Sequence, residues 1–121
     1  MMTFVKENYM YAKIEIYQLK PDIRNRSVWF QSLANFSAVK GSPKAADYDR
    51  VYEYTALSIP GSDTETVLEH VFRTFNIEKP RDFRGHSLSV SDVVVLDGVA
   101  YYVDVCGFKR LEKFKEEKSC Q

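Results

Sequence analysis

The stretch that decides the fold is "VVVLDGVAYYVDV", residues 93–105. Two apolar, β-prone runs at 93–96 and 99–105 flank the dipeptide Asp97-Gly98. A two-residue type I′ turn needs positive φ at both central positions, and Asp-Gly is among the pairs that adopt it most readily. We therefore predict a β-hairpin with its turn at Asp97-Gly98, and the rest of the chain is interpreted outward from it.

Two further strands are expected upstream. "KIEIYQLK" (13–20) alternates apolar and polar residues, which is typical of a strand with one buried face. "YDRVYEYTAL" (48–57) is rich in Tyr, Val and Thr, which favour strands. We predict one strand in each segment.

Two helices are expected between these strands and the hairpin. "SVWFQSLANF" (27–36) has Ser27 as a candidate N-cap and apolar residues at helical spacing, namely Trp29, Phe30, Leu33 and Phe36. Residues 37–47 are small and polar and predict a loop. Ser62 and Glu65 match a capping box that starts a second helix, which runs to about Phe75 with one apolar face, made by Val67, Leu68, Val71, Phe72 and Phe75.

The expected fold is a two-layer α+β domain with about four strands and two main helices, in the order β-α-β-α-β-β. The segment "GFKRLEKFKEEK" (107–118) forms a last helix or an extended tail, packed by Phe108, Leu111 and Phe114. We divide the chain into an N-terminal extension (1–12), one domain (13–114) and a polar tail (115–121).

Composition limits the functional classes. The chain has 121 residues and 45% hydrophobic content, which suits one domain with a packed core. Its 17 basic and 17 acidic residues cancel, so the basic footprint of a general nucleic-acid-binding protein is absent. No signal peptide or membrane-spanning run of about 18 apolar residues is seen, so we expect a cytoplasmic protein that binds no membrane.

Metal and cofactor chemistry finds little support. The soft or imidazole ligands are few and scattered (His70, His86, Cys106 and Cys120), whereas a structural zinc site needs four converging ligands. A thiolate pair of Cys106 with His86 is conceivable, but a buried structural cysteine is favoured, and both cysteines are expected to be free thiols. Phosphate-binding glycine loops are absent from the sequence. We therefore expect no metal, no cofactor and no catalytic residue.

The densest group of polar residues lies in "PRDFRGHSLSVSD", residues 80–92. If residues 84–92 are extended, one side carries Leu88, Val90 and a polar line beside the core, formed by Arg84, His86 and Asp92. In a structural interpretation, Ser91 and Asp92 turn the backbone and Gly85 supplies a positive φ. In a functional interpretation, this stretch is an anion or peptide site built by Arg81, Arg84 and His86.

This stretch also carries a family resemblance. "FNIEKPRDFRGHSLSVSDVVVLDGVAYYVDVCGFK" (75–109) resembles the YodL-like domain, with weaker similarity over 14–114. The positions that match the family pattern are Asn76, Pro80, Asp82, Gly85, His86, Ser87, Ser89, Ser91 and Asp92. The resemblance implies a small cytoplasmic domain of Gram-positive bacteria, frequent on conjugative and other mobile elements, with no catalytic residues to carry over.

The leading functional hypothesis is a non-enzymatic accessory domain that binds another protein, of unknown identity, with eight tyrosines as candidate contact residues. A first alternative is a nucleic-acid-binding module that uses basic residues, namely Arg81, Arg84, Lys109, Arg110 and Lys113. A second alternative is a small enzyme with His86 as base and Asp92 as its orienting partner. The sequence leaves the oligomeric state open.

Overall fold

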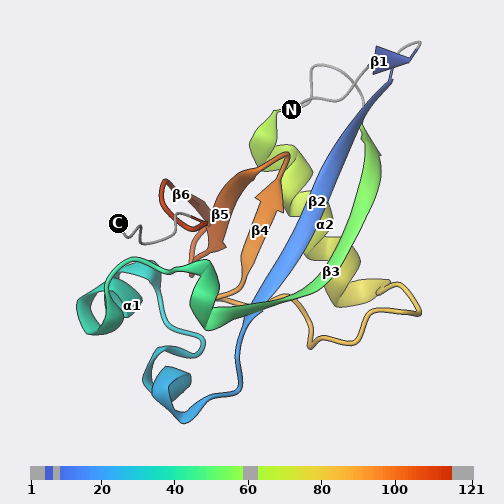
Figure 1. Ribbon diagram of the computed structural model, residues 1–121. Helices are drawn as coiled ribbons and strands as arrows, with labels where there is room; N and C mark the ends of the chain where they lie inside the picture. Colours follow the sequence, from blue (N-terminus) through green and yellow to red (C-terminus); the bar gives the residue numbers. More distant parts are fainter. Residues whose placement is uncertain (1–4, 7–8, 59–62, 116–121) are drawn as a thin grey trace.

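The computed structural model describes residues 5–6, 9–58 and 63–115 (Figure 1). Within these residues an antiparallel sheet is combined with helices, as expected for an α+β protein. The strands are β1 (Val5–Lys6), β2 (Tyr9–Leu19), β3 (Tyr48–Ser58), β4 (Val93–Leu96), β5 (Val99–Val103) and β6 (Phe108–Leu111). The helices are α1 (Leu33–Lys40), α2 (Thr64–Ile77) and two 3-10 helices, η1 (Ile23–Val28) and η2 (Ala45–Asp47).

The sheet runs β3-β2-β4-β5-β6, and every neighbouring pair is antiparallel. The short β1 pairs with the first residues of β2. It lies on the same edge of β2 as β4, which pairs with β2 further along that strand. The predicted elements follow one another as β2-α1-β3-α2-β4-β5, but β1 precedes them and β6 follows. Neither the predicted count of about four strands nor the order β-α-β-α-β-β is therefore matched exactly. β1 has only two residues, too few for a pattern, and β6 lies in the segment that was expected to form a last helix or an extended tail.

The hairpin prediction is confirmed. β4 and β5 pair directly across the turn, with Leu96 opposite Val99. Asp97 has φ 48° and Gly98 φ 86°, as a type I′ turn requires. Asp97 also accepts a hydrogen bond from the Lys13 N–H at 2.8 Å and donates its own N–H to the Lys13 carbonyl at 2.8 Å, which ties the turn to β2.

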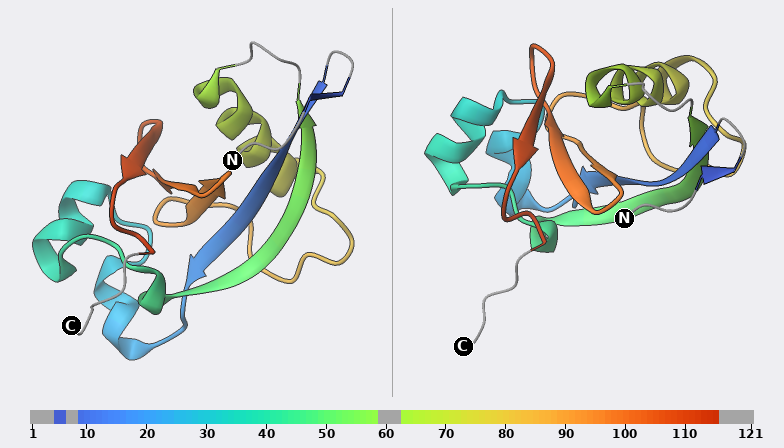
Figure 2. Two further views of the ribbon diagram at one scale, coloured as in Figure 1. Left: turned by 45° about the horizontal axis from the view of Figure 1, so that its top comes forward. Right: turned by 90° about the horizontal axis from the view of Figure 1, so that it is seen from above.

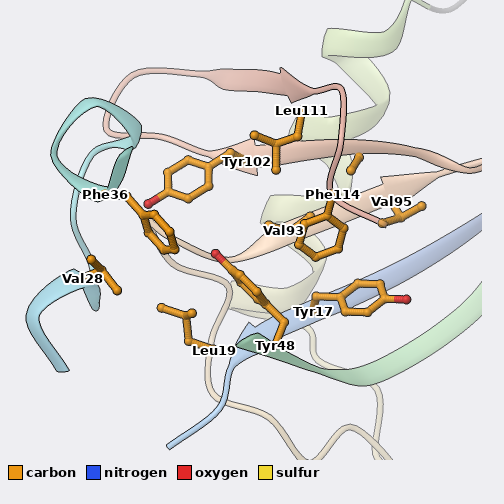
Figure 3. Close-up of a cluster of buried hydrophobic side chains, with 11 residues drawn as sticks. Tyr17, Leu19, Val28, Phe36, Tyr48, Val93, Val95, Tyr102, Leu111 and Phe114 are labelled. Carbon is orange, nitrogen blue, oxygen red and sulfur yellow. The ribbon is translucent and has the colours of Figure 1, made fainter. Parts of the chain in front are cut away.

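Both faces of the sheet are packed, whereas the sequence predicted two layers. On one face α2 and the loop after it cover a cluster made by Ile14, Ile16, Leu68, Val71, Phe75, Phe83, Leu88, Val94 and Val103. On the other face η1, α1 and the C-terminal segment enclose a second cluster, made by Tyr17, Leu19, Val28, Phe36, Tyr48, Val93, Val95, Ala100, Tyr102, Leu111 and Phe114 (Figure 3). Figure 2 shows α2 on one face, with α1 and η1 together away from it.

The central strand β2 is therefore buried on both faces, although its alternation predicted one buried face. Its polar residues Glu15 and Gln18 are each only 4% exposed. Glu15 accepts hydrogen bonds from the Tyr17 hydroxyl at 2.9 Å and from Lys115 Nζ at 3.2 Å. Burial opposes ionisation of Glu15, but these two partners outweigh it and lower its pKa.

The first helix begins later than predicted. The segment predicted as one helix, 27–36, contains the end of η1, a turn at Trp29 and Phe30, and the start of α1. Phe30 has φ 62°, which no α-helix continues through, so Ser32 rather than Ser27 is the N-cap of α1 and accepts from the Asn35 N–H at 3.1 Å. The predicted loop 37–47 is also partly wrong, because α1 continues to Lys40 and Ala45–Asp47 forms η2.

The second helix has the predicted apolar face, with Leu68, Val71 and Phe75 buried. Its N-cap is Asp63, whose carboxylate accepts from the Thr66 N–H at 2.9 Å, and Ser62 of the predicted capping box lies outside the described residues. The C-terminal segment is extended rather than helical, and β6 and the turn after it bury Leu111 and Phe114.

Candidate functional site

The polar stretch forms a loop between α2 and β4, which we call the signature loop (residues 78–92). It is not an extended strand entry, because two tight turns shape it: the Phe83 N–H donates to Pro80 at 3.1 Å and the Asp92 N–H to Ser89 at 3.0 Å. The predicted polar line is therefore wrong. Arg84 is exposed and apart from Asp92, whereas His86 and Asp92 do lie together.

Gln18 of β2 holds the signature loop in place. Its amide nitrogen donates to the His86 carbonyl at 2.8 Å and to Asp92 Oδ2 at 3.1 Å, and its amide oxygen accepts from the His86 N–H at 3.2 Å. Gln18 thus pairs with the His86 backbone as a neighbouring strand would. Sequence reasoning missed it, although an inward glutamine in register with Ile14 and Ile16 was a signal.

Gly85 is required by this close approach. A Cβ atom at Gly85 would lie 2.4 Å from Gln18 Oε1 and 2.9 Å from the Phe83 ring. The expected positive φ at Gly85 is wrong, since the glycines with positive φ are elsewhere, at Gly41, Gly98 and Gly107. The role of this glycine is therefore steric.

Asp92 is the most deeply buried acid of the site, at 1% exposure. Its Oδ2 accepts hydrogen bonds from the Ser89 N–H at 2.8 Å and from Gln18 at 3.1 Å. Burial raises the pKa of Asp92 to about 8, against the opposing effect of these two hydrogen bonds. Its carboxyl group is therefore largely neutral at pH 7.

His86 lies between Asp92 and the surface. Its Nδ1 donates to the Ser87 carbonyl at 2.7 Å, since a carbonyl can only accept. Its Nε2 is buried, has no hydrogen-bond partner within the described residues and lies 3.9 Å from Asp92 Oδ1. The ring packs against Trp29 and Phe30, with centroids 5.7 and 6.1 Å away, and the side chain stays 37% exposed.

Phe30 projects into solvent beside His86. It is 55% exposed and has φ 62°, a left-handed conformation that costs a side-chain-bearing residue about 1–2 kcal/mol. Its N–H donates to Ser91 Oγ at 3.1 Å, and Ser91 is itself left-handed at φ 86°. The Ser91 carbonyl accepts from the Tyr48 hydroxyl at 2.7 Å, which connects this pair to the core.

The exposed or half-buried rings Trp29, Phe30 and His86 together form what we call the aromatic surface. Sequence reasoning placed Trp29 and Phe30 in a buried helical stripe. The helix is wrong because both lie in the turn before α1, and only Trp29 packs against the core, partly buried. A left-handed phenylalanine leaves no sequence signal, because its conformation depends on the distant Ser91.

The remaining residues of the family pattern make local or cross-element contacts. Asp82 accepts from the Tyr52 hydroxyl of β3 at 2.7 Å. Asn76 Nδ2 donates to the Phe72 carbonyl at 2.7 Å near the end of α2. Ser87 contacts Lys79 Nζ at 3.3 Å through its hydroxyl and accepts from Ser89 Oγ at 2.8 Å through its carbonyl.

Arg81 and Arg84 are exposed at the outer end of the signature loop. Arg84 Nη1 donates to the Arg81 carbonyl at 3.2 Å, and neither guanidinium has an ion-pair partner among the described residues. Two of the three basic C-terminal residues differ: Lys109 pairs with Asp104 at 3.5 Å and Arg110 with Glu112 at 3.5 Å, whereas Lys113 has no ion-pair partner among the described residues. Unpaired positive charge is therefore more plentiful near the signature loop.

The part of the chain that the structure describes contains no cluster of three or more His, Cys, Asp or Glu side chains that could hold a metal ion. Cys106 is an exposed, unpaired thiol in the turn between β5 and β6, and Cys120 lies outside the described residues. None of the described helices is long and apolar enough to span a membrane.

Comparison with known proteins agrees with the resemblance. The family model of the YodL-like domain matches residues 13–114. A curated relative, "Uncharacterized protein R785" of Acanthamoeba polyphaga mimivirus, is 32% identical over 118 residues, covering 83% of this chain and 93% of the relative. No solved structure matches. The chain therefore belongs to the YodL-like domain family.

Proposed function

We propose that this protein is a non-enzymatic accessory module of the cytoplasm, associated with a mobile genetic element, which binds a protein partner through its aromatic surface. The observation that carries the proposal is Phe30, a large apolar side chain held out in solvent by a strained backbone. Left-handed non-glycine residues concentrate at functional sites, where the surrounding structure enforces them. Exposed aromatic rings are enriched at protein interfaces.

The rigidity of this surface supports a binding role. The Phe30 backbone is fixed by Ser91, and Ser91 is fixed by Tyr48, which is 3% exposed. A ring that is already ordered loses little conformational entropy when a partner covers it. Arg81 and Arg84 lie in the same loop as His86, so the partner surface that fits is apolar with an acidic rim.

The family context supports an accessory role. The curated relative belongs to a virus, and the family resemblance points to mobile elements of Gram-positive bacteria. Both settings require proteins that bind and modulate factors of a host or of the element itself. A small domain with a preformed aromatic surface suits that task.

The enzyme alternative is less well supported by the geometry. A general base must reach the proton that it abstracts. His86 Nδ1 is engaged by the Ser87 carbonyl, and Nε2 is buried and faces Asp92. Two well-formed pockets among the described residues are lined by other segments, one by α2 and the β5–β6 turn and one by β5, β6 and the segment after β6.

Nucleic-acid binding is the second candidate, favoured by the unpaired Arg81 and Arg84, which lie in the same loop as His86. His86 belongs to the aromatic surface, on which bases could stack. Titration with single-stranded DNA and RNA at about 50 and 200 mM salt tests it, because phosphate contacts weaken steeply over this range. Binding that is lost in Arg81→Ala/Arg84→Ala and falls with salt would support it. Binding that is absent at the lower salt would exclude it.

The protein-binding proposal is tested by affinity capture from cells of the native host, followed by binding measurements with the purified partner. Phe30→Gly removes the ring without backbone strain, and Val39→Ala trims another exposed apolar residue, 60% exposed on α1, as the matched control. We expect a partner that wild type and Val39→Ala retain and that Phe30→Gly binds at least ~10-fold more weakly, about 1.4 kcal/mol. A partner bound equally by all three proteins would contradict the proposal.

A further inference from the structure

A groove lies beside α2, away from the residues of the signature loop. It measures about 440 Å³ and is lined by one stripe of α2 and by the β5–β6 turn, namely Glu69, Phe72, Arg73, Asn76, Val105 and neighbouring residues. Figure 2 shows α2 and the β5–β6 turn rising on the same side of the sheet. α2 packs on β2, β3 and β4, whereas Tyr101 of β5 and Phe108 of β6 stay only partly buried beside it.

The rim of this groove is apolar. Phe72 is 38%, Ile77 72% and Val105 71% exposed, and these are half of the six large hydrophobic residues that are exposed in the described part of the chain. Phe72 packs edge-on against Phe108, with ring centroids 6.4 Å apart. Phe108 in turn packs against the buried cluster beneath α2, so the bottom of the groove is continuous with the core. Apolar surface gathered at one groove indicates an interaction site.

The charges in the groove are self-complementary. Glu69 and Arg73 lie one helical turn apart, and neither side chain has an ion-pair or hydrogen-bond partner within residues 9–58 and 63–115. The other charged lining residue, Asp104, is already occupied: it accepts from the Leu33 and Val105 N–H groups and pairs with Lys109 at 3.5 Å. The groove therefore offers one unpaired charge of each sign.

We propose that this groove is a homodimer interface in which two copies of α2 pack antiparallel across a two-fold axis. Reversing the helix direction sets Glu69 of each copy opposite Arg73 of the other, so the two unpaired charges form two equivalent ion pairs. Phe72 then lies next to the axis, and Ile77 and Val105 lose exposed surface. Such an interface is isologous, as two-fold symmetry requires.

The overall charge of the chain agrees with a second copy as the occupant. With 17 basic and 17 acidic residues the protein has no net charge, so two copies meet without overall repulsion. The β3 edge of the sheet is less suited to pairing. β3 carries a bulge opposite Ile16–Tyr17 and charged side chains such as Arg50 and Glu53, which are features that prevent edge-to-edge pairing.

The test is analytical ultracentrifugation of the full chain over a concentration series at low salt. We expect a concentration-dependent dimer for wild type. Glu69→Arg and Arg73→Glu should each raise the dimer dissociation constant at least ~10-fold, because each places like charges opposite one another. An equimolar mixture of the two variants should restore dimers, since positions 69 and 73 then carry opposite charges in both pairs across the axis.

Two controls keep the result specific. Glu78→Arg reverses an exposed charge just after α2 that does not line the groove, and it should dimerise like wild type. Thermal melts establish that all variants are folded. A wild type that stays monomeric up to about 1 mM, single variants that dimerise like wild type, or a mixture that stays monomeric would each overturn the proposal.

Discussion

The Phe30 N–H donates to Ser91 Oγ at 3.1 Å, and both residues have left-handed backbones, at φ 62° and φ 86°. Each conformation is unfavourable for a residue with a side chain. The hydrogen bond joins them across 61 positions of sequence, so each strained turn holds the other in place. The result is an exposed ring at the edge of the site, kept there at a cost in stability.

The first prediction concerns this strain. Replacing Phe30 with Ala removes the ring and keeps the strained backbone, whereas Gly removes both. We expect Phe30→Gly to be more stable than Phe30→Ala by about 1 kcal/mol, because glycine adopts positive φ freely. Chemical denaturation of both variants measures the difference. At an ordinary helical position such as Val39 the Gly variant should instead be less stable than the Ala variant, since glycine in a helix costs about 1 kcal/mol relative to alanine.

The second prediction concerns pH. Burial raises the pKa of Asp92 from 3.8 to about 8, so between these values the folded protein holds a proton that the unfolded chain has released. The contribution of Asp92 to the free energy of unfolding is therefore complete below pH 4. It is lost as the pH rises towards 8, at up to about 1.4 kcal/mol per pH unit. Asp92→Asn, which resembles the neutral acid, should remove this slope.

Urea denaturation of wild type and Asp92→Asn at several pH values between 5 and 9 measures the difference between the two curves. Taking this difference cancels the contribution of carboxylates with lowered pKa, such as Asp22 and Asp63, which are common to both proteins. A difference that does not change with pH would mean that Asp92 is ionised in the folded state.

The third prediction concerns Gln18. Gln18→Ala leaves the partly buried His86 N–H and carbonyl without their partner, and each unsatisfied group costs about 1–3 kcal/mol. It also removes one of the two hydrogen bonds to the buried Asp92 carboxyl, which keeps only the bond from the Ser89 N–H. We expect a loss of at least about 3 kcal/mol in the free energy of unfolding. Gln31→Ala is the control, because that side chain bonds only Asn35 at the surface and should cost less than about 1 kcal/mol. Equal effects of the two substitutions would contradict the role of Gln18.

The fourth prediction tests the close approach at Gly85. Gly85→Ala should destabilise the protein by about 1–3 kcal/mol, because its Cβ would meet Gln18 Oε1 at 2.4 Å. In a Gln18→Ala background one source of the clash is removed, and only the Phe83 ring remains. We therefore expect the double variant to lose less free energy of unfolding than the sum of the losses of the two single variants. A double-mutant cycle by thermal or chemical denaturation measures this difference. Strict additivity would show that Gly85 and Gln18 are not coupled.

The expectations from sequence succeeded where a few neighbouring residues decide the structure. The Asp97-Gly98 turn, the strands at 13–20 and 48–57 and the buried face of α2 are all present. They failed where two interpretations were locally equivalent. The aromatic spacing at 27–36 fits a helix, yet a left-handed Phe30 divides it. For the segment after residue 107 the sequence left a helix and an extended tail open, and pairing with β5 makes it extended.

The sequence by itself determined the family, the α+β class and the hairpin, because turn chemistry and alternation act over short distances along the chain. Only the tertiary structure decided the site. Gln18 reaches His86 and Asp92 across 68 and 74 positions, and the neutral state of Asp92 follows from its burial rather than from its neighbours in sequence. Contacts between distant segments and the exclusion of water arise only when the chain has folded, so no local pattern could have revealed them.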